Sequence, residues 1–423
     1  MEIRLLDSAL RQIAERYPAH EARRQPVHTV YGGGHLFRHD TAHKLGELAR
    51  KSLADHAPDS KTFASAIGLR EDLADTVYAR VLAKLEREPV EDFRIDFEDG
   101  YGTRPDSEEN RHVELAAQEV ARGARENTLP PFIGIRIKSF SRELHVRSAR
   151  TLDLFVTTLA RELNGELPRN FVVTFPKIQH VDQVRAFAEV LARVESDVKL
   201  HRRIPIEIMV EQPQTIFMPD GRAALPLIHD ACDGRLVGAH FGTYDYTASL
   251  GITAAHQHML HPACDFAKNM MQVAFAGTGV MLSDGATNVM PVAGPGGSHA
   301  SVHAAWRLHA EHVRHSLETG FYQGWDLHPA QLPTRYATVF AFFLEGRAAA
   351  TERLKNFVEK AAQATLVGDV FDDAATGQGL LNFFLRGLSC GALTEDEALQ
   401  TGLTLEELRS KSFVKVLENR KKR

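Results

Sequence analysis

The chain has 423 residues, and 43% of them are hydrophobic, which is enough apolar material for a large core. The 50 basic and 55 acidic side chains give a formal net charge of −5, whereas a nucleic-acid-binding protein would carry a basic excess. The three cysteines (Cys232, Cys264 and Cys390) are isolated in sequence and form no metal-binding spacing. We therefore expect no nucleic-acid partner, no disulfide framework and a reducing compartment.

The N-terminal residues carry charges throughout and lack the apolar core of a cleavable signal peptide. No run along the chain approaches the roughly 20 apolar residues that are needed to cross a bilayer. These two features predict a cytoplasmic protein without a membrane partner.

The predicted elements alternate between strand and helix along most of the chain. An amphipathic helix over 1–17 comes first, and a strand near residue 28 ends in Gly32-Gly33-Gly34. Two inserted helices, about 41–56 and 70–88, precede the second strand. The other seven strands are expected near residues 94, 133, 172, 207, 237, 280 and 323, with helices near 107–126, 147–163, 181–195, 222–231, 262–276 and 299–318.

Eight β-runs separated by helical patterns predict a closed parallel TIM (β/α)8 barrel of the α/β class rather than an open sheet. Past about residue 350 the pattern changes to helices only. We therefore expect two parts, a barrel over residues 1–350 that carries the active site and an all-helical C-terminal extension over residues 351–423.

Polar side chains gather where the predicted strands end, and in TIM barrels the chemistry takes place at that end of the strands. The starts of the strands have nothing comparable. The polar residues at the strand ends are Glu98, Asp99, Arg136, Lys138, Lys177, Glu211, Asp245, Asp284 and His328.

Two of these acids, Glu211 and Asp245, follow neighbouring buried strands and can share one ion, with water in the remaining positions. Ligation by oxygen alone favours Mg²⁺ or Mn²⁺ over Zn²⁺. Such an ion can be chelated by a 2-oxo acid and can stabilise its enolate as a Lewis acid. Arg136 is permanently charged and suits the same developing oxyanion. The alternative for each acid is that it caps the turn or helix that follows it.

Other candidates have an ordinary structural interpretation beside the functional one. The Gly32–Gly34 run could admit a phosphate, or it could be a plain turn. A histidine in the loop His256–His261 could act as a base, while the histidines along 299–315 are typical of surface or packing positions. Lys177 could form a Schiff base or orient a carboxylate.

The motifs, in their order along the chain, resemble those of the HpcH/HpaI aldolase and citrate lyase β-subunit (CitE-like) superfamily, whose members are phosphoenolpyruvate/pyruvate-type barrels. The resemblance spans roughly residues 27–335. The matching segments are Asp96-Phe-Glu-Asp-Gly100, Arg136-Ile-Lys138, Pro176-Lys177, Glu211 within Val-Glu-Gln-Pro, Gly242–Gly251 and His328-Pro-Ala-Gln331.

The resemblance implies that Glu211 and Asp245 bind magnesium and that Arg136 contacts the enolate. It also implies a catalytic lid acid at Asp373, in Asp372-Asp373-Ala-Ala-Thr376, that reaches a neighbouring subunit in a homo-oligomer. The residues that would bind substrate are Glu98, Asp99, Lys138, Lys177 and His328. Lys138 stands where the family has Asn, and the first strand lacks the usual Arg-Ser, so an acyl-CoA substrate does not follow from the resemblance.

The sequence thus predicts a Mg²⁺- or Mn²⁺-dependent carbon–carbon lyase or aldolase that acts on a 2-oxo acid or a 3-hydroxyacyl substrate. The substrate would be a small carboxylic acid or its CoA thioester. Two alternatives stay open at this point. One is phosphoenolpyruvate-type phosphoryl or enolate chemistry on the same site, and the other is a non-catalytic ligand-binding barrel subunit.

Overall fold

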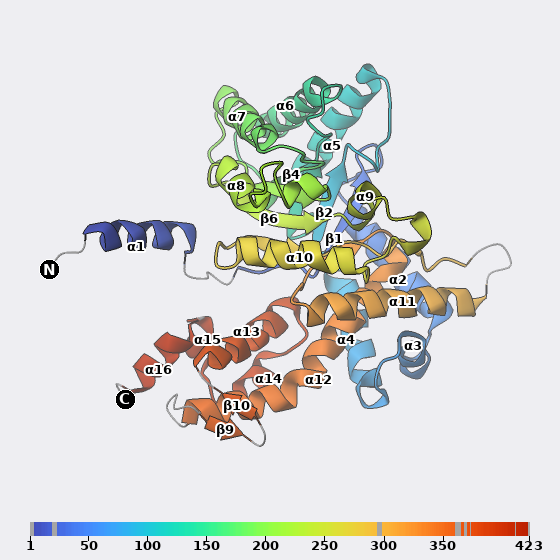
Figure 1. Cartoon of the computed structure of the whole chain (residues 1–423). Coiled ribbons are helices and arrows are strands. Elements are labelled where there is room, and N and C mark those ends of the chain that lie inside the picture. Colours follow the sequence, from blue (N-terminus) through green and yellow to red (C-terminus); the bar gives the residue numbers. More distant parts are fainter. Residues whose placement is uncertain are drawn as a thin grey trace.

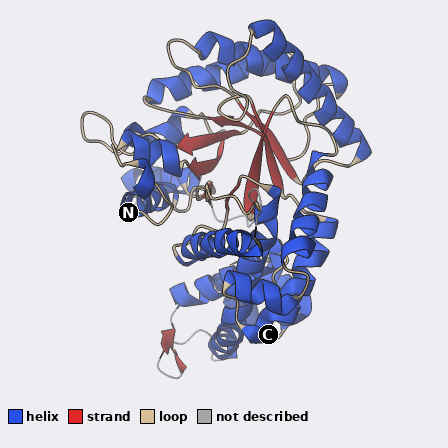
Figure 2. Cartoon of the chain, turned by 90° about the vertical axis from the view of Figure 1, so that its right-hand side faces the viewer, coloured by secondary structure: helices blue, strands red, loops and turns tan. Residues whose placement is uncertain are grey.

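The computed structural model describes residues 4–18, 23–293, 298–359, 365–367, 370–372, 374–410 and 412–421. Eight parallel strands form a barrel with helices around it, so the predicted TIM-barrel fold is confirmed (Figures 1 and 2). The strands are β1 (His28–Gly33), β2 (Asp92–Asp96), β3 (Phe132–Arg136), β4 (Phe171–Phe175), β5 (Ile206–Val210), β6 (Leu236–Phe241), β7 (Met281–Ser283) and β8 (Gly324–Asp326).

The strands pair in the order β7-β6-β5-β4-β3-β2-β1-β8, so the barrel closes between β7 and β8. There the ladder is short. The backbone N–H of Asp284 donates to the carbonyl of Gln323 at 2.8 Å, and that of Trp325 donates to the carbonyl of Gly285 at 3.0 Å. One parallel bridge, Ala286 to Trp325, completes the contact. The circle is therefore nearly complete.

The barrel helices occupy the predicted positions to within a few residues, and two further helices, α3 (Ser60–Ile67) and α9 (Thr243–Ser249), were not predicted. Asp245 lies in the first turn of α9, directly after β6. The helices up to the end of the barrel are α1 (Arg4–Arg16), α2 (Thr41–His56), α3 (Ser60–Ile67), α4 (Ala74–Arg87), α5 (Asp106–Glu126), α6 (His145–Glu162), α7 (Val181–Asp197), α8 (Ala224–Ala231), α9 (Thr243–Ser249), α10 (Pro262–Phe275) and α11 (His299–Glu318). None of the helices in the described part of the chain combines the length and apolar character needed to cross a membrane.

The outward faces of the strands are apolar, as alternation predicts, and Ile95, Ile135 and Ile208 are completely buried against the helices. The inward faces are ionic. Arg94 on β2 donates to both carboxylate oxygens of Glu207 on β5, at 3.0 and 2.6 Å. A buried ion pair of this kind needs complete hydrogen bonding to offset the loss of hydration, so the barrel interior is a tightly specified polar core.

The chain continues from β8 into α12 (Leu332–Glu359), which runs without a break through residue 350. The division into residues 1–350 and 351–423 therefore stays a prediction. The extension is helical, with one short antiparallel hairpin of β9 (Thr365–Val367) and β10 (Val370–Asp372). Its helices are α13 (Ala374–Cys390), α14 (Glu395–Leu399), α15 (Leu405–Arg409) and α16 (Phe413–Lys421), which lie together beside α12 (Figure 1).

Candidate active site

The carboxyl ends of β2, β4, β5 and β6 bring five predicted residues together around one ammonium group. Lys177, which follows β4, places its Nζ 3.1 Å from Oε1 of Glu98, 3.0 Å from Oδ2 of Asp99 and 3.1 Å from Oδ2 of Asp245. Glu211 joins them through the backbone of Lys177. We call these five residues the Lys177 cluster.

The position of Glu211 is fixed by close backbone contacts. The N–H of Lys177 donates to Oε1 of Glu211 at 2.7 Å, and Lys177 has a φ of 49°. This left-handed conformation costs a non-glycine residue about 1–2 kcal/mol. On the other side lies Gly242, where an added Cβ would come within 2.5 Å of Cβ of Glu211. The chain thus accepts local strain and requires a glycine to hold one buried carboxylate in place.

Burial and like charge dominate the electrostatics of the cluster. Burial of Glu211, opposed only in part by Lys177, raises the pKa of its carboxyl to about 8. Burial also raises the pKa of Glu98. Burial disfavours the ammonium of Lys177, but Glu211, Glu98 and the other acids outweigh it and raise the pKa of Lys177. A lysine held in its protonated form is not suited to a Schiff base, which requires a free amine.

Arg136, at the end of β3, lies beside the cluster and is fully buried. Its Nε and Nη2 donate to the two oxygens of Asp96 at 2.8 and 2.5 Å, and its Nη1 lies 3.2 Å from Oε2 of Glu98. The guanidinium also lies over the rings of Tyr31 and Trp325, 4.9 and 5.9 Å from their centroids. Two of the three nitrogens are therefore fixed by Asp96, and Nη1 is directed to the cluster.

Lys138, which was expected among the substrate-binding residues at the strand ends, does not join the cluster. Its ammonium binds Oε1 of Glu109 at 2.8 Å and the carbonyl of Phe97 at 2.5 Å. The reason is that β3 ends at Arg136, so the alternation of faces stops before Lys138. Glu109, on α5, has a completely buried side chain that requires a cation.

Four other predicted candidates have other partners or lie outside the described residues. His328 caps the short helix η4 (Pro329–Gln331), where its Nδ1 accepts from the N–H of Ala330 at 3.1 Å. Within the loop His256–His261, His261 caps α10 in the same way. Asp284 is bound by Lys268 at 2.9 Å and has a structural role. Asp373 lies outside the described residues.

The comparisons with known proteins place the chain in a family without assigning an activity. The model of a domain of unknown function, DUF6986, matches residues 6–416. The chain belongs to the DUF6986 family. No curated protein matches it.

Solved structures show which fold this DUF6986 member shares. A citrate lyase from Burkholderia xenovorans LB400 is 17% identical, with 90% of this chain and 98% of that chain covered and a TM-score of 0.59. A malate synthase from Haloferax volcanii, in a pyruvate/acetyl-CoA complex, is 13% identical. The match covers 95% of this chain and 99% of that chain, with a TM-score of 0.49. An HpcH/HpaI aldolase/citrate lyase family protein from Burkholderia cenocepacia J2315 is 12% identical. The match covers 82% of this chain and 99% of that chain, with a TM-score of 0.40. The likeness to the citrate lyase confirms the predicted resemblance to citrate lyase-type barrels at the level of the fold.

Three residues of this DUF6986 member that lie beside the Lys177 cluster, Asp96, Tyr31 and Trp325, were not predicted as site residues. Asp96 accepts hydrogen bonds from the backbone N–H groups of Glu98 and Gly100, at 2.9 and 2.8 Å, in addition to those from Arg136. It thereby organises both the arginine and the turn that carries Glu98. The sequence did contain a pattern that could have indicated Asp96, because this residue is the first of the motif Asp-Phe-Glu-Asp-Gly. The aromatic residues gave no signal, because a strand tyrosine or tryptophan is typical of an ordinary core.

The donors of the Lys177 cluster can be tested for their fit to a divalent cation. In the described ranges, no three His, Cys, Asp or Glu side chains are gathered in a way that could hold a metal ion by themselves. The predicted site uses two carboxylates and completes its coordination with water or substrate. All the candidate donors are oxygen atoms, and they already surround one positive charge, that of Lys177. Their chemistry therefore fits Mg²⁺ or Mn²⁺.

Proposed function

We propose that this protein is a Mg²⁺- or Mn²⁺-dependent carbon–carbon lyase or aldolase that acts through the enolate of a 2-oxo acid or a related 3-hydroxyacyl compound. The observation that carries the proposal is the convergence of Glu98, Asp99, Glu211 and Asp245 on Lys177 at the carboxyl end of the barrel. A site with this excess of carboxylates, at the face where barrel enzymes carry out their chemistry, is suited to a cation and an anionic substrate together.

In this proposal Glu211 and Asp245 hold the cation, which when bound supplies a Lewis acid for the keto oxygen of the substrate. Nη1 of Arg136 donates to the oxygen that gains charge as the enolate forms. Because Asp96 fixes the other two nitrogens, the guanidinium needs no reorientation when that charge appears. The catalytic roles of Arg136 and of the lid acid Asp373 stay predictions of the resemblance.

Cleavage of the carbon–carbon bond also requires a group that accepts the proton of the substrate hydroxyl. As the bond breaks, the hydroxyl-bearing carbon becomes a carbonyl group and the electron pair of the bond enters the enolate, which takes a proton at carbon to give the shorter acid or thioester. Glu98 suits the proton transfer, because burial raises its pKa and its Oε1 and Oε2 lie near Lys177 and Arg136. Asp99, whose side chain is 59% exposed, and Lys177 would orient the polar end of the substrate.

The fold is in accord with this class of reaction, since the citrate lyase that shares it is by name a lyase. A phosphoenolpyruvate-type reaction has less support from the geometry. Lys138, a cation that could bind a phosphate, already donates a hydrogen bond to Glu109. The backbone of Gly32–Gly34 is closely packed, since an added Cβ at Gly34 would lie 2.4 Å from the ring of Phe97. The cytoplasmic location, the homo-oligomer and the choice between free acid and CoA thioester remain predictions.

Deuterium exchange tests the proposal. The full chain is incubated in D₂O with short 2-oxo acids, including pyruvate and oxaloacetate, and with phosphoenolpyruvate, with and without Mg²⁺. We expect metal-dependent exchange of the C3 protons of one acid, followed by NMR, and a loss of about a hundredfold or more in Glu211→Gln and Asp245→Asn. Asp220→Asn, at an exposed acid that pairs with Arg222, is the matched control. Exchange of no acid in the presence of metal would favour the ligand-binding subunit instead.

A further inference from the structure

A cavity lies at the opposite end of the barrel from the Lys177 cluster. It has a volume of about 980 Å³ and lies between the starting ends of β6 and β7 and the helix α13 of the extension. Leu236 and Val237 on β6, Met281 on β7, and Asn382 and Arg386 on α13 are among its lining residues. Figure 1 shows α13 below α10, whose last turn also lines the cavity. The cavity is therefore formed jointly by the barrel and the extension.

The described residues that line this cavity carry charge of one sign. Among them are two arginines, Arg23 and Arg386, and no aspartate or glutamate. Arg386 lies with its guanidinium 4.0 Å from the ring centroid of Tyr322, and its Nη1 donates to Oε1 of Gln25 at 3.1 Å. These are neutral partners. Among the described residues Arg386 forms no ion pair, and burial lowers its pKa.

Three arginines that are more deeply buried than the half-buried Arg386 show how this chain normally pairs a guanidinium. Arg94, Arg136 and Arg335 bind the carboxylates of Glu207, Asp96 and Asp326 respectively. A half-buried cation that has only neutral partners gains charge-assisted hydrogen bonds when an anion binds to it. Arg386 thus differs from the structural arginines in lacking an anion of its own.

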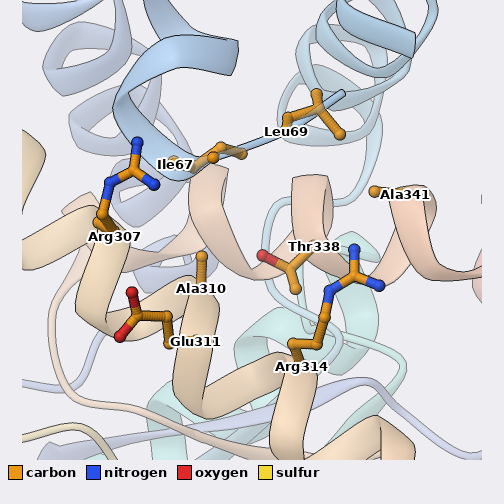
Figure 3. Close-up of a pocket in the computed structure, with 9 residues that line it drawn as sticks. Ile67, Leu69, Arg307, Ala310, Glu311, Arg314, Thr338 and Ala341 are labelled. Atoms are coloured by element: carbon orange, nitrogen blue, oxygen red, sulfur yellow. The ribbon is translucent and has the colours of Figure 1, made fainter. Parts of the chain in front are cut away.

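A smaller pocket shows the contrast. It has a volume of about 170 Å³ and lies among α3, α11 and α12, where Figure 3 shows Arg307 and Arg314 at its edges. Arg307 donates to the carbonyl of Ser65, and Arg314 makes two hydrogen bonds to Glu345, at 2.7 and 3.0 Å. Glu311 adds a negative charge to the lining. That pocket is small and its charges are already balanced.

We propose that the 980 Å³ cavity binds an organic anion, a carboxylate or a phosphate monoester carried on an apolar body. Arg386 would bind the anionic group, with Nε and Nη2 as the available donors. The apolar body would lie against Phe275, Val339, Phe343 and Leu385, which line the same space. The volume is at the upper end of the roughly 300–1,000 Å³ that small-molecule sites usually have.

This ligand site is independent of the metal and of the enolate chemistry. The cavity touches β6 at its first residues, Leu236 and Val237, and Asp245 lies past the other end of the same strand. One six-residue strand spans about 20 Å. A ligand in the cavity and a substrate at the Lys177 cluster can therefore be bound at the same time.

Binding of two anionic probes and their neutral analogues tests the site. Octanoate and phenyl phosphate, compared with 1-octanol and phenol, are titrated calorimetrically into the full chain. We expect at least one anion to bind tenfold or more tightly than its neutral analogue, and the two arms distinguish a carboxylate site from a phosphate site. Arg386→Met should abolish this preference and Arg386→Lys should restore part of it. Arg409→Met, at an exposed arginine beside Glu395, should change nothing.

A second variant keeps the test valid if Arg386→Met does not fold. Asn382→Trp retains Arg386 but fills part of the cavity. It should also lower the affinity for the anionic probe at least tenfold. The proposal is overturned if neither anion binds, if neutral and anionic probes bind equally, or if both cavity variants leave the affinity unchanged. It is also overturned if Glu211→Gln, rather than Arg386→Met, abolishes binding, because the probe would then occupy the Lys177 cluster.

Discussion

The backbone N–H of Lys177 donates to Oε1 of Glu211 at 2.7 Å, while the side chain of the same lysine binds the acids around it. Lys177 therefore has two separable roles. Its left-handed backbone positions the buried carboxylate, and its ammonium balances the charge of the cluster. The separation of these roles leads to the first prediction.

Replacing Lys177 by Asn should strengthen the binding of Mg²⁺ by about tenfold or more. Asn accepts the left-handed conformation, so the hydrogen bond to Glu211 is retained, but the competing positive charge is removed. Calorimetric titration with Mg²⁺ measures the change. Lys199→Asn is the matched control, since Lys199 has a φ of 54° and is exposed. Weaker binding in Lys177→Asn would show that the ammonium does not compete with the ion.

The affinity for Mg²⁺ should depend on pH because of Glu211. Burial raises the pKa of this carboxyl to about 8 in the metal-free protein, so the ion must displace a proton at lower pH. We expect the affinity to rise by up to about tenfold per pH unit between pH 6 and pH 8 and to level off above. Titrations in buffers of different ionisation enthalpy should detect about one proton released per ion near pH 6.5. An affinity that is constant over this range would exclude Glu211 as a ligand.

Gly242→Ala should disrupt the cluster even though alanine is a small residue. The added Cβ would meet Cβ of Glu211 at 2.5 Å and its Oε2 at 2.8 Å, so the carboxylate must move. We expect at least a tenfold loss of Mg²⁺ affinity and of proton exchange, with the fold retained by circular dichroism. Gly379→Ala in α13 is the control, because an added Cβ there meets nothing within 4 Å. Equal behaviour of the two variants would show that the site tolerates displacement of Glu211.

Asp326→Ala should cost about 3–5 kcal/mol in the free energy of unfolding, measured by urea denaturation. Asp326 is completely buried, its Oδ1 lies 2.9 Å from Nη2 of Arg335, and its Oδ2 lies 2.9 Å from Nδ1 of His28. Its removal leaves a buried guanidinium without an anion. A matched change at an exposed pair, Asp72→Ala beside Arg70, should have a much smaller effect, because water screens that pair. A small effect at Asp326 would mean that water enters to hydrate Arg335.

Most of the barrel could be predicted because its signals are local. Val27–Tyr31 and Phe171–Phe175 are short apolar runs between helical patterns, and the structure has strands at both positions. The convergence of Glu98, Lys177, Glu211 and Asp245 could also be predicted. Each follows a predicted strand, and the parallel strands of a barrel bring their carboxyl ends to one face. These inferences need only the periodicity and the order of the elements.

The remaining features depend on contacts between distant residues, which a single sequence does not show. Lys138 is two positions after Arg136, so alternation along a strand would place both side chains on one face. It lies beyond the end of β3, however, and its ammonium donates to Glu109, 29 residues earlier. The pairing of Arg94 with Glu207 inside the barrel joins residues 113 positions apart. The choice between an ammonium and a divalent cation as the partner of the carboxylates is a balance of energies, and no spacing encodes it.

Binding of Mn²⁺, followed by electron paramagnetic resonance, tests the metal site most directly. The full chain should bind one ion, and addition of ¹⁷O-labelled pyruvate should broaden its signal, because the substrate oxygen would enter the coordination sphere. The double variant Glu211→Gln, Asp245→Asn should lose that ion while the fold is retained. Undiminished binding of Mn²⁺ by the double variant would contradict the assignment of the Lys177 cluster as the metal-dependent active site.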